Sequence, residues 1–217
     1  MKNSISIISL FILASCSALD TSRIAPGYTE AFNAIKVSIF GSKNEIDPNL
    51  ISNIPYASMI VRIGKGPKAL MILESISKDK YTWVSADGVY LVIKNGKIVK
   101  TQGLPNNLNE RLEPNVNWDQ YSLTKLSFVS YLSFINPTLN NLKVESNFVI
   151  KEEKEEKLVF GNKKLKLIEE KISSDLIGWN ETNKYWIDKN NFVWMSIQYI
   201  SPKLPPIYFE VTKKPSG

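Results

Sequence analysis

The chain contains no histidine, and this absence removes several classes of function at once. Hydrolases that use Ser-His-Asp or Cys-His chemistry need an imidazole base, and many zinc sites need imidazole ligands. The sequence also has no P-loop, no G-x-G-x-x-G fingerprint, no G-x-S-x-G elbow and no cluster of metal-ligand residues. We therefore expect a protein that is not an enzyme and that uses neither a cofactor nor a metal.

Cysteine is nearly absent as well, because the 217 residues contain only Cys16. A disulfide framework is excluded, so the burial of apolar side chains must stabilise the fold. Long hydrophobic runs are also missing: residues 5–14, ISIISLFILA, fall short of the roughly 20 apolar residues that span a bilayer. A basic residue precedes this run and small residues follow it, which is the pattern of a secretory signal peptide.

The residues around the cysteine, Leu13-Ala14-Ser15-Cys16, resemble the lipobox of bacterial lipoproteins. In that class the cysteine thiol receives a diacylglycerol, the peptide is cut before it, and the new N-terminus is acylated by a fatty acid such as palmitate. A thiolate is nucleophilic enough for this step, and stable anchoring needs more than one acyl chain. The alternative is an ordinary secretory signal in which the cysteine is accidental.

The lipobox predicts how the first part of the chain is used. Residues 1–15 are expected to be removed, Cys16 to be the lipid-attachment site, and residues 16–27 to form a tether. Ser17, rather than an aspartate, follows the cysteine, which resembles an outer-membrane address. We therefore expect a protein of the cell envelope, anchored in the outer membrane and facing the periplasm.

The charge is positive, with 27 Lys and Arg against 21 Asp and Glu, or +6. Basic proteins often bind nucleic acid, but a secreted lipoprotein rarely meets it, so we expect no nucleic-acid partner. A basic surface in the envelope suits anionic lipid headgroups or acidic polysaccharide. The alternative is that the lysines serve solubility alone.

The pattern of apolar residues predicts a mainly β protein with one helix near its start. Apolar residues at helical spacing predict a helix over residues 28–40. From residue 58 onward, short alternating segments are separated by turn signals, of which Asn95-Gly96 is the strongest. Residues 103–120 are expected to form a polar loop, and the charge run KEEKEEK, residues 151–157, a solvated hairpin tip.

About a dozen short strands cannot bury their inner face as a flat sheet. We therefore expect residues 28–217 to form a single domain, a strongly curved antiparallel sheet with the N-terminal helix packed on it. The sheet would be either a sandwich or an incomplete barrel.

Two S-x-x-K pairs, at Ser75 and Ser122, raise the question of Ser-Lys catalysis, but no SDN or KTG motif accompanies them. Aromatic residues are the stronger candidates for ligand contact. Strict alternation along residues 192–200 places Trp194 and Gln198 on the same face, where they would contact a sugar, and Trp83 is a further candidate. The alternative is that these side chains pack in the core.

Several segments together resemble the YjbF/GfcB family of capsule- and exopolysaccharide-operon lipoproteins. They are SMIVRIGKGPKALMILE at residues 58–74, YTWVSADGVYLVIKNGKIVKTQGL at residues 81–104, and NKYWIDKNNFVWMSIQYISPKLPPIYFEVTKKP at residues 183–215. The resemblance covers most of the mature chain and is weakest over residues 105–160. It implies a lipoprotein that works with other envelope proteins in polysaccharide secretion or assembly. Of the family's functional residues, only the lipidated cysteine carries over, onto Cys16.

Three functions remain open at this stage. The first is a non-enzymatic accessory to polysaccharide export, which binds a glycan or an export partner. The second is a half-barrel carrier of lipids or lipoproteins, which needs a large apolar cavity. The third is an enzyme acting on glycans, which needs two carboxylates facing one cleft; Glu74, Glu113 and Asp119 are available for this.

Overall fold

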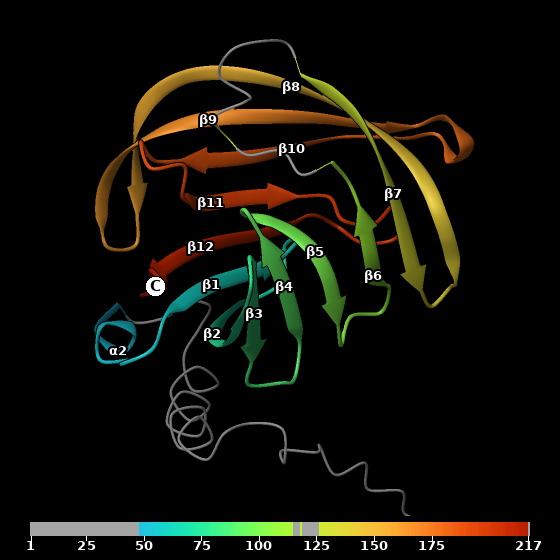
Figure 1. Ribbon diagram of the computed structural model, residues 1–217. Coiled ribbons are helices and arrows are strands. Elements are labelled where there is room, and N and C mark those ends of the chain that lie inside the picture. Colours follow the sequence, from blue (N-terminus) through green and yellow to red (C-terminus); the bar gives the residue numbers. More distant parts are fainter. Residues whose placement is uncertain (1–47, 115–117, 119–125, 217) are drawn as a thin grey trace, which may run out of the picture.

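The computed structural model describes residues 48–114, 118 and 126–216. Within them the chain forms one antiparallel sheet of twelve strands in the order β5-β4-β3-β2-β1-β12-β11-β10-β9-β8-β7-β6 (Figure 1). The elements are α2 (Pro48–Ser52), β1 (Ser58–Ile63), β2 (Lys68–Ser77), β3 (Lys80–Ser85), β4 (Tyr90–Lys94), β5 (Lys97–Gln102), β6 (Asn107–Leu112), β7 (Ser127–Ile135), β8 (Leu139–Leu158), β9 (Gly161–Ser174), the 3₁₀ turn η3 (Asp175–Ile177), β10 (Trp179–Ile187), β11 (Val193–Gln198) and β12 (Ile207–Lys213).

The sheet curls until its first and last strands, β5 and β6, lie close together, so it forms a nearly closed barrel (Figure 1). The prediction of a strongly curved antiparallel sheet is confirmed, in its incomplete-barrel form. The helix predicted over residues 28–40 lies outside the described residues. Among those described, no helix has the length and apolarity needed to cross a membrane.

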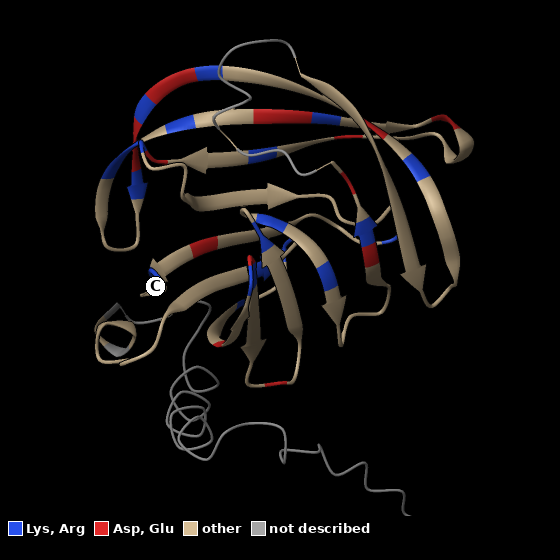
Figure 2. Cartoon of the chain, in the orientation of Figure 1, with Lys and Arg blue, Asp and Glu red and all other residues tan. Residues whose placement is uncertain are grey.

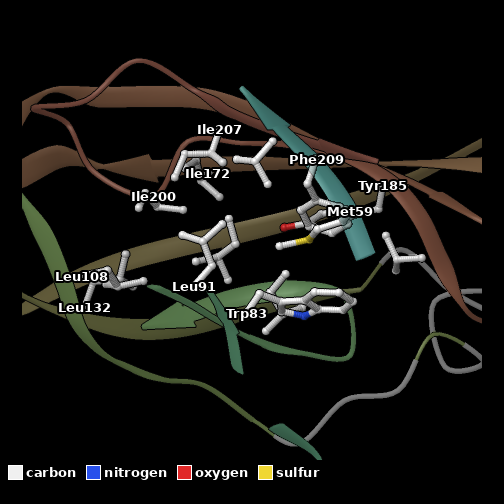
Figure 3. Close-up of a cluster of buried hydrophobic side chains, with 14 of the residues drawn as sticks. Met59, Trp83, Leu91, Leu108, Leu132, Ile172, Tyr185, Ile200, Ile207 and Phe209 are labelled. Atoms are coloured by element: carbon white, nitrogen blue, oxygen red, sulfur yellow. The ribbon is translucent and has the colours of Figure 1, made fainter. Parts of the chain in front are cut away.

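The barrel interior is filled by apolar side chains, which alternate with outward-facing ones along the regular parts of the strands. Met59 of β1, Trp83 of β3, Tyr185 of β10 and Phe209 of β12 come from four different strands and lie together in the interior (Figure 3). Each of the four is at most 3% exposed. Burial of this kind contributes roughly 1.5–3 kcal/mol for each large apolar side chain, which explains how the fold is stable without a disulfide.

A second, smaller apolar cluster covers the outer face of β1, β2 and β3. Ile51 of α2 and Ile54 just after it pack with the outward residues Ile60 and Ile72. The tip of the long β8–β9 hairpin reaches the same area, because Val159 packs on this cluster and its N–H donates a hydrogen bond of 2.6 Å to Oε1 of Glu210 on β12. The outer face of these strands is therefore covered by two segments distant in the sequence.

The structure corrects two predictions about polar segments. The expected loop at residues 103–120 contains β6, which pairs with β7 and places Leu108 in the core. The charge run at residues 151–157 is part of β8 rather than a hairpin tip, and the turn falls at residues 159–160. Cross-strand pairing of opposite charges stabilises this part of the sheet: Glu153, Glu155 and Glu156 lie opposite lysines of β9.

The Asn95-Gly96 turn between β4 and β5 was predicted correctly, and its glycine has two reasons to be there. Both residues have positive φ angles, 48° and 76°, as a two-residue hairpin turn requires. A Cβ atom on Gly96 would also lie 2.2 Å from Cγ2 of Val193 on β11. The turn is thus packed directly against the opposite wall of the barrel.

We expect Gly96→Ala to destabilise the protein by roughly 2–5 kcal/mol, because it adds overpacking against Val193 to the cost of a positive φ. Gly161→Ala is the matched control: Gly161 also has a positive φ, 95°, but nothing lies within 4 Å of its added Cβ. Urea unfolding of both variants measures the difference. Equal losses for the two variants would contradict the packing argument.

Candidate functional site

The seam between β5 and β6 is the place where the barrel is not closed by backbone hydrogen bonds. Eleven strand pairings join the twelve described strands, and none joins these two. At one end, side chains take over: the Leu108 N–H donates to Oγ1 of Thr101 at 2.9 Å. Asn107 accepts from the Leu104 N–H at 3.0 Å and donates to the Leu104 carbonyl at 2.8 Å. The Thr101–Leu108 bond crosses the seam, and the Asn107 bonds close the turn that connects β5 to β6.

At the other end of the seam, beside the Asn95-Gly96 turn, there is a groove of about 570 Å³. We call it the seam groove. Its lining comes from the edges of β3 to β6 and from Trp118, and blue segments mark its basic residues on β4, β5 and β6 in Figure 2. The charged residues that line it are Lys80, Lys94, Lys97, Lys100, Arg111, Glu110 and Glu113.

The floor beneath the groove is built around the carboxylate of Glu170 on β9, which is fully buried. One carboxylate oxygen accepts from Nζ of Lys97 at 3.0 Å and from Oγ of Ser146 at 2.8 Å. The other accepts from Nδ2 of Asn183 at 3.0 Å and from the hydroxyl of Tyr185 at 2.6 Å. Four donors therefore satisfy this carboxylate, as a buried charge requires.

Lys97 extends this network across the seam. It begins β5, yet its ammonium group reaches Glu170 on β9 and also lies 2.8 Å from Oε2 of Glu113, just after β6. Nη1 of Arg111 on β6 lies 3.8 Å from the same oxygen of Glu113. Two cations and two carboxylates thus balance in a buried group that joins β5 to the strands on the other side of the seam.

The pKa of Glu170 records this environment. Burial alone would raise the pKa of the carboxyl group, but the charges of Lys97 and Arg111, with the hydrogen bonds from Asn183 and Tyr185, outweigh burial and lower it to about 2. The Tyr185 hydroxyl, which is buried beside this carboxylate, has its pKa raised well above the usual value. Glu170 is therefore ionised, and Tyr185 neutral, throughout the physiological range.

Trp118 closes the inner side of the seam groove. Its indole N–H donates to the Asn95 carbonyl at 2.8 Å, and its ring packs on Tyr185 with a centroid distance of 4.9 Å. Only 4% of this residue is exposed. Trp118 therefore forms part of the wall and offers no free ring face for stacking.

Gln198, predicted as a ligand contact, is instead a buried structural residue. Its Oε1 accepts from the Ile98 N–H at 2.9 Å, and its Nε2 donates to the Gly96 carbonyl at 2.8 Å and to Ser196 Oγ at 2.9 Å. The prediction that it shares a face with Trp194 was wrong, because a bulge between residues 193 and 195 breaks the alternation of β11. Gln198 faces inward and ties β11 to the β4–β5 turn.

The two predicted tryptophans also serve packing. Trp83 is 3% exposed in the core, at the inner end of an apolar pocket of about 280 Å³ at one mouth of the barrel. Trp194 is half-buried: its N–H donates to Asp188 at 2.9 Å, its ring lies edge-on to Phe192, and Nζ of Lys163 lies 4.0 Å from its centroid. A lysine thus already occupies a face of Trp194.

The remaining predicted residues are not brought together into a catalytic site. Ser75 lies near the exposed end of β2 rather than on a helix. Glu113 is committed to Lys97, while Cys16, Ser122 and Asp119 lie outside the described residues. Among the residues described, no group of three or more Asp, Glu or Cys side chains has the arrangement of a metal site.

Sequence reasoning missed the buried charges at the seam. One signal was available: in β9 the inward positions run Ile168, Glu170, Ile172, so a glutamate stands where the alternation demands an apolar residue. A charge at such a position requires a partner. Its partner Lys97 is 73 residues away, a distance over which the sequence pattern carries no information.

Comparison with known proteins identifies the family of this chain. The family profile described as "Group 4 capsule polysaccharide lipoprotein gfcB, YjbF" matches residues 29–211. The chain belongs to the YjbF family. The resemblance seen in the strand and turn motifs is thereby confirmed, and with it the place of the protein among lipoproteins of the cell envelope that are associated with capsule polysaccharide.

Individual members of the YjbF family show how far the similarity extends. The chain is 26% identical over 218 residues to the uncharacterized lipoprotein YjbF of Escherichia coli K12, covering 95% of both chains. It is 30% identical over 107 residues to the lipoprotein GfcB of the same organism, or 49% of this chain and 46% of GfcB. The crystal structure of the hypothetical lipoprotein YmcC from E. coli K12 superimposes with a TM-score of 0.70 at 22% identity. The match covers 86% of this chain and 96% of the YmcC chain.

We expect Glu170→Gln to destabilise the protein by about 3–5 kcal/mol at pH 7, because it leaves two buried cations with the Glu113 carboxylate alone. The pKa of Glu170 is lowered, so its contribution is present above the unfolded-state pKa near 4.5 and is lost as pH falls toward about 2. The free energy of unfolding of the wild type should thus fall over this range more steeply than that of the variant.

Glu169→Gln is the matched control for this prediction. Glu169 is the neighbouring residue on the outer face, where it pairs with Lys151 at 3.3 Å and Lys184 at 3.8 Å. Surface pairs of this kind contribute up to about 1 kcal/mol. Denaturant unfolding at several pH values measures all three proteins, and a loss for Glu170→Gln no larger than that of the control would refute the role assigned to the network.

Proposed function

We propose that this protein is a non-enzymatic accessory to the secretion or assembly of capsule or exopolysaccharide, held at the periplasmic face of the outer membrane. Membership of a capsule-associated lipoprotein family carries the proposal. It is supported by the similarity to YjbF over 95% of both chains, since two proteins that align from end to end share the whole architecture. The role proposed is the binding of a passing glycan or of another export protein.

Anchoring through Cys16 is the second part of the proposal. The apolar run before it and the lipobox-like residues 13–16 favour lipidation of its thiol. Ser17 favours retention in the outer membrane. Acylation by more than one chain would give stable membrane attachment while leaving the barrel in the periplasm.

The chemistry of the interior favours binding over catalysis. A general acid or base works best with a pKa near the working pH, whereas four hydrogen-bond donors hold Glu170 and its pKa is about 2. Glu113 is engaged by Lys97. Both of these carboxylates are thus engaged in ion pairs with buried cations at the floor of the seam groove.

The alternative of a half-barrel lipid or lipoprotein carrier receives less support. Such a carrier needs a large apolar cavity, but side chains from opposite walls fill the barrel (Figure 3). The apolar pocket at the barrel mouth, about 280 Å³, is smaller than the roughly 300–1,000 Å³ of typical ligand sites. The larger seam groove is lined mainly by charged and polar residues.

Deletion of the gene tests this function, with secreted and cell-associated polysaccharide measured separately. We expect secretion to fall, wild-type protein to restore it, and Cys16→Ser protein at an equal level to leave it at the deletion value. Labelling with a palmitate analogue, followed by membrane fractionation, checks that the two forms differ in lipidation and location. Unchanged polysaccharide in the deletion strain would overturn the proposal, and mislocalisation of other lipoproteins would favour the carrier.

A further inference from the structure

We propose that the seam groove is a binding site for an acidic glycan segment, recognised through the carboxylate groups of its sugars. This inference rests on the proposed function, because it names the ligand class that the accessory would hold. Four features of the groove support it: a row of like charges, lysines that form no ion pair with a described residue, a buried guanidinium, and hydrogen-bonding groups suited to sugar hydroxyls.

The first feature is a row of lysines across three strands. Lys80 of β3 lies directly opposite Lys94 of β4, and Lys94 lies directly opposite Lys97 of β5. Like charges at opposed positions destabilise a sheet. A protein keeps such a row at a cost in stability, and a negatively charged ligand across it would remove the repulsion.

The second feature is that nearby carboxylates pair with only some of the lysines that line the groove. Lys94 pairs with Asp79 at 2.8 Å, and Lys97 pairs with Glu113 and Glu170. Neither Lys80 nor Lys100 forms an ion pair within the part of the chain that the structure describes. Both are exposed and line the groove, so their ammonium groups are available to a ligand.

The third feature lies across the seam on β6. The side chain of Arg111 is 3% exposed and lines the groove, but its Nε has no hydrogen-bond partner among the described residues. A buried donor that is left unsatisfied is unfavourable, and a charged acceptor such as a carboxylate is the group that a guanidinium binds best. The cations therefore face the groove from both of its sides.

The fourth feature selects a sugar over a simple anion or a nucleic acid. Glu110 and the amides of Asn95 and Asn109 line the same groove. Glu110 forms no ion pair with any described residue, so its carboxylate is placed to accept hydrogen bonds from hydroxyl groups. Acidic sugars carry both carboxylates and hydroxyls, and the groove volume of about 570 Å³ lies within the usual range for ligands.

The test titrates the full-length protein, purified in detergent, with oligogalacturonate and with its methyl-esterified form, which has the same sugar backbone without the charge. Isothermal titration calorimetry at low and moderate salt measures both. We expect the acidic form to bind at least about tenfold more tightly, with an affinity that falls as salt increases. Equal binding of the two forms, or no binding of the acidic form, would overturn the inference.

Charge-matched variants locate the site. Lys80→Gln with Lys100→Gln removes the two groove lysines that form no ion pair with a described residue, and we expect it to weaken binding of oligogalacturonate about fivefold to tenfold. Lys157→Gln with Lys171→Gln removes the same charge from exposed positions on β8 and β9 and should leave binding unchanged. Equal losses in both variants would mean that net charge alone attracts the ligand. Displacement by millimolar inorganic phosphate would mean a general anion site, which refutes the glycan assignment.

The failure of this inference can be told apart from the failure of the proposed function. If the Lys80→Gln, Lys100→Gln protein restores polysaccharide secretion fully in the deletion strain, the seam groove is not the site of the activity, and the accessory function stands. If deletion itself leaves polysaccharide unchanged, the accessory function fails, while calorimetry still decides whether the groove binds acidic sugars.

Discussion

The bond between Lys97 and Glu170 is the interaction on which the closure of the barrel depends. A sheet of twelve strands curls back on itself, but its first and last strands do not share a ladder. Lys97 reaches from β5 to Glu170 on β9 and to Glu113 beside β6. Buried ion pairs therefore hold this part of the barrel together in place of backbone hydrogen bonds. The same group sets the low pKa of Glu170 and forms the floor of the groove above it.

The regular part of the fold could be predicted from the sequence, because turn residues separate alternating strands there. The first strand, β1, begins at residue 58, where the alternating pattern was predicted to start, and the Asn95-Gly96 hairpin joins β4 to β5 as predicted. Two strand segments were missed because tertiary context decides them. In β6, Leu108 is the one residue that joins the main core, and residues 151–157 of β8 depend on pairing with lysines of β9.

The site was much less predictable than the fold. Trp83 and Gln198 were chosen as ligand contacts from residue type and alternation, but Trp83 is in the core, and a bulge reverses the alternation of β11. Glu170 was detectable as a charge in an inward position, yet the identity of its partners depends on how the barrel curls. The lysine row needs the strand register, since only the pairing places Lys80 opposite Lys94.

In the described part of the chain, eleven ladders join twelve strands, so the barrel wall has one line, the seam, that lacks backbone hydrogen bonds. Along every other line of its wall, widening the barrel requires breaking a row of backbone hydrogen bonds. Along the seam, widening requires only that side-chain interactions break. The two ends of the seam differ: Thr101 bonds to Leu108 next to the turn that connects β5 to β6, whereas at the other end Lys97 is held by its ion pair with Glu170. Any widening of the barrel at the seam is therefore expected to begin at the Lys97 end, because at the other end a short turn joins the two strands covalently.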